Sequence, residues 1–146
     1  MSSISQLGRV FNLASSVTTG AKRAALTDAS GIGFVVAGAS GATTLTITEA
    51  NAATGGTSQT LAGTFDYWTM PATGPAIWTK GAGGVNGTSI NTLAAAGALL
   101  YVFIPQGALS DGFSYLAASH ATGTIIYIMG DLDVQRRPVN LRDVTA

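Results

Sequence analysis

The chain has 146 residues and no cysteine, and its seven Lys and Arg residues balance its seven Asp and Glu residues. This length is typical of one domain with a substantial hydrophobic core, and the lack of cysteine excludes a disulfide framework and thiol chemistry. Charged residues form only 10% of the chain, against about 25% in ordinary globular proteins. So little charge indicates that partner subunits cover much of the surface, and the zero net charge disfavours nucleic-acid binding, which needs clustered cations.

The few charges are unevenly distributed along the chain. Six of the seven cations lie near the two ends, and Lys80 is the only cation between residues 31 and 130. We therefore expect a single domain with three parts: an extended N-terminal arm at residues 1–30, a β-rich body at residues 31–130 and a C-terminal tail at residues 131–146. The arm has no sustained helical period, so we expect it to be ordered only where it lies against another surface.

The body opens with two strand signals. Residues 33–38 form an apolar run between glycines, which predicts a buried strand. Residues 43–49 alternate threonine with Leu45 and Ile47, the pattern of a half-buried strand. Because a short turn at residues 39–41 separates them, we expect these two strands to pair as an antiparallel hairpin.

An aromatic stretch follows the glycine-containing loop at residues 51–57. Residues 65–70 are ended by Pro71, and we expect residues 76–80 to pair with them through a proline-containing connection. The glycine-rich segment 81–87 lacks the spacing of phosphate-binding loops, so it predicts a surface loop.

The last third of the body carries the strongest strand signals. Residues 99–104 end at Pro105, and residues 92–98 before them are compatible with a helical turn. Residues 113–118 and 124–129 flank a turn at residues 121–123, which predicts a second hairpin. About six to eight short strands, spaced by roughly ten residues, predict an all-β fold with an antiparallel sandwich or barrel-like body.

No group of residues combines into a convincing catalytic site, and we predict neither an enzyme nor a cofactor. His120 is the only histidine; its neighbour Ser119 would point to the opposite face of a strand, so the two form no dyad, and a turn-flanking or interface role is favoured. Asp131 and Asp133 would share a face and could bind a cation, but the same alternation describes a solvated edge strand, which we favour. We therefore predict no metal site.

The aromatic residues Tyr67, Trp68 and Trp78 allow two interpretations. Aromatic faces suit carbohydrate rings, so the three could form a sugar-binding platform. Their position in apolar strands favours a place in the core or in a subunit interface instead.

The charged ends supply the candidate partner-binding residues. Arginine pairs bidentately with carboxylates, so clustered arginines suit an acidic protein surface. The N-terminal arm keeps a surplus of cations, whereas Asp131, Asp133 and Asp143 balance the C-terminal arginines, which favours protein over nucleic acid as the partner. The candidate set comprises Leu7, Arg9, Phe11, Lys22, Arg23, Arg136, Arg137 and Arg142.

No targeting or membrane segment is predicted. The first residues lack a basic region followed by an apolar stretch, so no secretory signal is expected. The longest apolar run, residues 93–104, has 12 residues, fewer than the about 20 needed to span a bilayer.

Three features together carry a resemblance to a known family. The chain opens with Ile4-Ser5-Gln6-Leu7-Gly8-Arg9, continues with a body rich in Thr, Gly and Ala, and closes on a strand followed by Asp131-Leu132-Asp133-Val134-Gln135-Arg136. In these features it resembles the capsid decoration (head stabilisation) proteins of tailed bacteriophages.

The resemblance implies a non-enzymatic virion protein. Such a protein is made in the host cytoplasm, lies on the capsid surface, often forms a trimer, and cements neighbouring major capsid protein subunits. Two alternatives remain open: another phage structural component, such as a tail tube, tail fibre or minor head protein, or a carbohydrate-binding β-sandwich.

Overall fold

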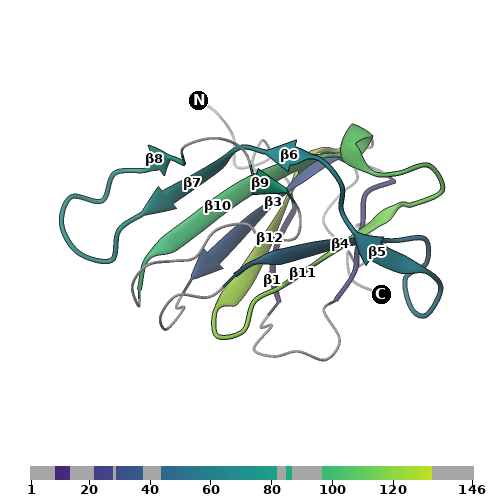
Figure 1. Cartoon of the computed structure of the whole chain (residues 1–146), viewed down its shortest axis with the longest axis horizontal. Coiled ribbons are helices and arrows are strands. Elements are labelled where there is room, and N and C mark those ends of the chain that lie inside the picture. The colour runs from purple at the N-terminus through teal and green to yellow at the C-terminus, as the bar shows by residue number, and fades with distance from the viewer. Residues whose placement is uncertain are drawn as a thin grey trace.

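The fold is a sandwich of two antiparallel sheets with a separate two-stranded ladder beside them (Figure 1). The structure, a computed structural model, describes residues 9–13, 22–27, 29–37, 44–81, 85–86 and 97–132. The prediction of an all-β sandwich is confirmed.

The larger sheet has six strands in the order β1-β12-β3-β10-β7-β8, each antiparallel to its neighbours. Its central strands are long and rich in β-branched and aromatic residues, which favour extended backbone. The strands are β1 (Arg9–Leu13), β12 (Thr124–Leu132), β3 (Ala29–Ala37), β10 (Leu99–Pro105), β7 (Tyr67–Met70) and β8 (Thr79–Lys80).

The smaller sheet has four strands in the order β2-β11-β4-β5. They are β2 (Ala24–Ala25), β11 (Tyr115–Ser119), β4 (Thr46–Ala50) and β5 (Ser58–Thr60). The separate ladder pairs β6 (Thr64–Phe65) with β9 (Val85–Asn86), and a 3-10 turn, η2 (Gln106–Ala108), follows β10.

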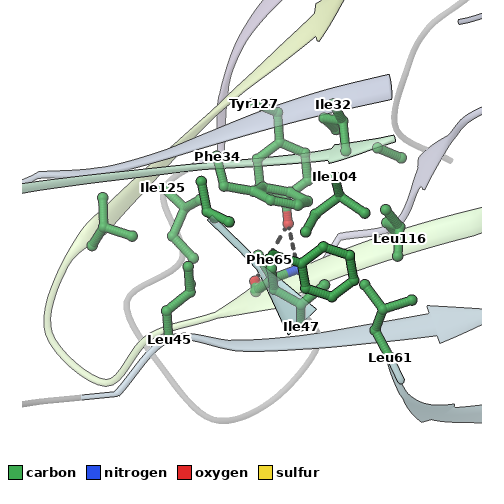
Figure 2. Close-up of a cluster of buried hydrophobic side chains, with 14 of the residues drawn as sticks. Ile32, Phe34, Leu45, Ile47, Leu61, Phe65, Ile104, Leu116, Ile125 and Tyr127 are labelled. Carbon is green, nitrogen blue, oxygen red and sulfur yellow. Dashed lines mark hydrogen bonds between the residues drawn. The ribbon is translucent and has the colours of Figure 1, made fainter. Parts of the chain in front are cut away.

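The hydrophobic core lies between the inner faces of the two sheets (Figure 2). Alternate residues of each strand point inward, as the two-residue period of a strand requires. Phe34 and Tyr127 meet edge to face with ring centroids 4.8 Å apart. The buried set includes Ile32, Phe34, Val36, Leu100, Val102, Ile104, Ile125, Tyr127 and Met129 from the larger sheet and Ile47, Leu116 and Ala118 from the smaller. Each of the large side chains contributes about 1.5–3 kcal/mol by burial.

Two predicted hairpins, one pairing residues 33–38 with 43–49 and the other pairing residues 113–118 with 124–129, are wrong. In each case the chain passes from one sheet to the other after the turn. β3 lies between β12 and β10 in the larger sheet, whereas β4 pairs with β11 and β5 in the smaller. β11 and β12 likewise belong to different sheets. In each case the inward residues of the two strands face the same core from opposite sides. The predicted pairing of residues 65–70 with 76–80 is confirmed where β7 pairs with β8.

Part of the expected N-terminal arm belongs to the sandwich. β1 pairs with β12 along all five of its residues. Ala24, Leu26 and Ala29 have no exposed surface and join the core, because their small or apolar side chains fill space between the sheets. The packed body therefore begins before residue 31. Residues 1–8, 14–21, 91–96 and 133–146 lie outside the described residues.

Candidate functional site

The outer face of the larger sheet is apolar over four of its six strands. On β12, β3, β10 and β7 the outward positions that the structure describes carry no charged side chain. The outer faces of antiparallel sheets are ordinarily polar where they meet water. We call this surface the apolar face; it comprises Thr124, Ile126, Ile128, Gly130, Gly33, Val35, Ala37, Leu99, Tyr101, Phe103, Trp68 and Met70.

The outer face of the smaller sheet has the opposite chemistry. Its outward side chains mostly carry hydroxyl groups, which hydrogen-bond to water. We call this surface the hydroxyl face; it comprises Thr46, Thr48, Ser58, Thr60, Tyr115 and Ser119, with the buried Ala50 and Ala117 at outward positions between them. The sandwich therefore has one face suited to water and one face that ordinarily would be covered.

Strand register aligns the apolar face into a continuous row. Ile126 lies opposite Val35, Val35 opposite Tyr101, and Tyr101 opposite Trp68. Lys80 continues the row opposite Trp68 on β8. Side chains directly opposite on one face of a sheet contact each other, so the row changes from aliphatic to aromatic to charged as it crosses the sheet.

Glycines allow the aromatic rings of β10 to lie close to the sheet. A Cβ atom added to Gly33 would lie 2.8 Å from Cε2 of Tyr101, and one added to Gly31 would overlap the ring of Phe103. The two rings thus occupy the space above β3 that other residues would fill with their own side chains. Glycine within a strand commonly marks such a close approach. The result is a low aromatic surface rather than a row of protruding side chains.

A cluster of aromatic residues lies where the β7–β8 hairpin joins this face. The hairpin extends at one end of the molecule (left in Figure 1), and its residues 71–80 are exposed. The ring centroid of Tyr101 lies 5.8 Å from that of Trp68 and 6.4 Å from that of Trp78, within the range of favourable aromatic pairs. Trp78 remains 43% exposed. We call Trp68, Trp78 and Tyr101 the aromatic cluster.

An ion pair borders the aromatic cluster. Nζ of Lys80 lies 2.7 Å from Oδ2 of Asp66, and more than half of each side chain is exposed. The same Nζ lies 6.0 Å from the ring centroid of Trp68. An exposed pair of this kind adds only about 0–1 kcal/mol to stability. Its chemical consequence is a hydrogen-bond donor and an acceptor beside exposed aromatic rings.

The structure separates the three aromatic residues that the sequence singled out. Trp68 and Trp78 belong to the cluster, but Tyr67 is buried and packs against Gly81. Tyr101 joins the other two and was missed. Residues 99–104 are apolar throughout, so the sequence did not mark Tyr101 as an outward residue, and only the register of β10 against β7 brings it opposite Trp68. Burial raises the pKa of Tyr101, so its hydroxyl is neutral at neutral pH.

Arg23 and Lys22 are the candidate partner-binding residues whose side chains the structure describes. Nη1 of Arg23 donates hydrogen bonds to the carbonyl oxygens of Ala52, at 2.7 Å, and Gly55, at 2.5 Å. Arg23 therefore holds the loop that follows β4. Lys22 is exposed.

The other candidate residues are not brought together with these two. Arg9 and Phe11 lie on β1 at the edge of the larger sheet. Leu7, Arg136, Arg137 and Arg142 lie outside the described residues, so their role in partner binding stays a prediction.

Glu49 is a buried carboxylate that links distant segments. Its Oε1 accepts hydrogen bonds from Nε2 of Gln59 and Oγ of Ser110, both at 2.6 Å, and its Oε2 accepts one from the Ser110 backbone N–H at 2.8 Å. Burial raises the pKa of Glu49, but these hydrogen bonds outweigh burial and hold the pKa below its ordinary value of 4.5. The arrangement ties β4 and β5 to the segment after η2, which is a structural role.

His120 is also buried and flanks a turn, as expected. Its Nδ1 accepts hydrogen bonds from the backbone N–H groups of Gly123, at 2.9 Å, and Thr122, at 3.4 Å. This contact fixes the turn through which the chain passes from β11 to β12. Among the residues that the structure describes, no three His, Asp or Glu side chains gather as metal ligands would.

Comparisons extend neither the fold nor the site to a known family. Neither a protein-family model nor a curated protein nor a solved structure matches the chain. Within the described part of the chain, no helix is long and apolar enough to cross a membrane.

Proposed function

We propose that the protein is a non-enzymatic virion structural protein that binds the outer surface of a phage capsid and cements neighbouring major capsid protein subunits. One observation supports an assembly role above all: the apolar face lies on one side of the sandwich and the hydroxyl face on the other. Contiguous exposed apolar surface marks a protein interaction site. A sandwich with a single such face suits a subunit that sits on a larger surface and turns its other side to water.

The size of the apolar face indicates how it would be used. Four strands about 4.8 Å apart and up to about nine residues of 3.3 Å give a face of roughly 20 by 30 Å. This is somewhat less than the about 800 Å² that each partner buries in a standard stable interface. Further contacts are therefore needed, and the charged ends of the chain are our candidates for them. A capsid lattice also repeats the same site many times, which compensates for a modest individual contact.

The assignment to a capsid rests on the resemblance of the opening and closing segments to decoration proteins. The apolar face supports assembly in general, and a sister subunit could cover part of it. We propose a homo-oligomer, with a trimer favoured, that contacts the major capsid protein.

Copy number in purified particles tests this function. Particles from a culture that produces the virus would be separated into heads and tails, and each fraction would be quantified by mass spectrometry. A decoration protein is expected in the head fraction, at a molar amount comparable with that of the major capsid protein. Presence only in tails, at low copy, would favour a tail component and contradict the proposal.

A further inference from the structure

The aromatic cluster differs in chemistry from the rest of the apolar face. On β12 the face presents the aliphatic side chains of Ile126 and Ile128, which suit a protein surface. At the β7–β8 hairpin it combines three aromatic rings with the Lys80–Asp66 pair. We propose that the aromatic cluster is a carbohydrate-binding site, a function beyond capsid docking.

The rings have the arrangement that such a site needs. Tyr101 lies low on the sheet above Gly33, and Trp78 stands at 74° to it with the centroids 6.4 Å apart. Trp68 is tilted at 42° on the neighbouring strand. The rings thus form a floor with an upright wall instead of a closed stack. The C–H groups of a pyranose are drawn to the electron-rich faces of aromatic rings, so a sugar ring can pack in this corner.

The polar groups at the rim decide which sugars fit. The ammonium group of Lys80 donates hydrogen bonds and the carboxylate of Asp66 accepts them, so together they can serve the hydroxyl groups of one sugar. The pair has no net charge, so it attracts neither an anionic nor a cationic ligand over long range. The site therefore fits a neutral oligosaccharide. Because its rim is polar, it suits such a ligand better than it suits a wholly apolar protein surface.

Binding would be measured on the full-length chain with a panel of neutral hexasaccharides of glucose, N-acetylglucosamine, mannose and galactose. Tryptophan fluorescence reports contact with the cluster, and calorimetry gives the affinity. We expect saturable binding of at least one member of the panel. In Trp78→Ala, we expect binding to be weaker by about tenfold or more, because one stacking surface is lost.

Matched variants separate the cluster from the rest of the face. Trp78 and Lys80 are both exposed, so Trp78→Ala and Lys80→Ala are expected to fold, which thermal unfolding checks. Phe103→Ala removes an exposed aromatic ring of the same face outside the cluster and is expected to bind sugar as the wild type does.

Three results would overturn the proposal. One is the absence of saturable binding across the whole panel. Another is a Trp78→Ala variant that retains full sugar affinity. The third is a Trp78→Ala variant that loses particle binding while the wild-type protein binds no sugar, which would make the cluster part of a protein interface. In the last case the proposed capsid function would survive. Sugar binding without any association with particles would instead support the sugar site and contradict the capsid function.

Discussion

The hydroxyl of Tyr127 accepts a hydrogen bond from the backbone N–H of Ala118 at 2.9 Å, across the two sheets (Figure 2). The same hydroxyl lies 3.2 Å from the carbonyl oxygen of Lys22 and 3.3 Å from that of Ala118. Ala24 and Leu116 are the last residues that β2 and β11 pair, and the same register would bring Lys22 opposite Ala118 two residues further on. Tyr127 therefore fills the position where the ladder of the smaller sheet opens, and it joins that sheet to the larger one.

Replacing Tyr127 with phenylalanine tests this junction. The ring would still pack on Phe34, but the buried N–H of Ala118 would lose its partner. We expect a loss of about 1–3 kcal/mol in the free energy of unfolding, measured with denaturant. Tyr115→Phe, on the hydroxyl face, is the control and should change stability by less than about 0.5 kcal/mol. Equal stability of the two variants would mean that the junction contributes nothing.

The same residue predicts how stability changes at alkaline pH. Burial raises the pKa of Tyr127 to about 12, from an ordinary value of 10.0. The raised pKa contributes roughly 2–3 kcal/mol to the free energy of unfolding. This contribution is complete below pH 10.0 and is lost as the pH rises through the folded-state pKa of Tyr127. Tyr101, whose pKa is also raised, adds to this loss. We expect the Tyr127→Phe variant to lose less stability than the wild type between about pH 9 and 12, and parallel curves would contradict this.

Glu49 predicts a second dependence, at acid pH. Because the folded-state pKa of Glu49 is lowered, its contribution is present above pH 4.5 and is lost as the pH falls through the folded-state value. Glu49→Gln places an amide N–H₂ group against donors from Gln59 or Ser110 and should cost about 1–3 kcal/mol at neutral pH. Its stability should also fall less steeply in acid. Asp111→Asn, an exposed change nearby, is the control, and an equal effect of both variants would refute the role of Glu49.

Gly31 tests the close approach between β3 and the rings of β10. A Cβ atom there would overlap the ring of Phe103 and lie 2.7 Å from the backbone oxygen of Ile104. We expect Gly31→Ala to destabilise the fold by about 1–3 kcal/mol, since the backbone oxygen of Ile104 cannot move aside freely. Gly107→Ala meets no atom within 4 Å and should be nearly neutral. Thermal unfolding of the two variants measures this difference. A neutral Gly31→Ala would show that the Phe103 ring and the strand move aside without cost.

Local pattern was enough to predict most strands but not their partners. The alternation around Leu45 and Ile47 marks β4, and Pro105 marks the end of β10, because each signal lies within the strand itself. The turns after β3 and β11 look the same whether a strand folds back on its neighbour or crosses to the other sheet. That choice depends on the side from which the inward residues reach the shared core, and no short stretch of sequence determines it.

The site depends still more on long-range contacts. Glu49 and Ser110 are 61 residues apart in the sequence, so the buried carboxylate could not be recognised. Tyr101 and Trp68 meet only through the register of β10 and β7. The apolar face was hidden for a related reason: its residues resemble core residues in sequence, and only the arrangement of the sheets shows that they point outward.

The most direct test of capsid docking places the same charge on each outer face. Ile128 on the apolar face and Thr48 on the hydroxyl face are both half-buried strand residues. A lysine stem can lie along the surface and carry its charge into water, so both lysine variants are expected to fold. Occupancy on capsids that lack the protein would be measured by titration. We predict that Ile128→Lys binds at least about tenfold more weakly than the wild type and that Thr48→Lys binds normally. Full occupancy by Ile128→Lys, or an equal loss in both variants, would contradict docking through the apolar face.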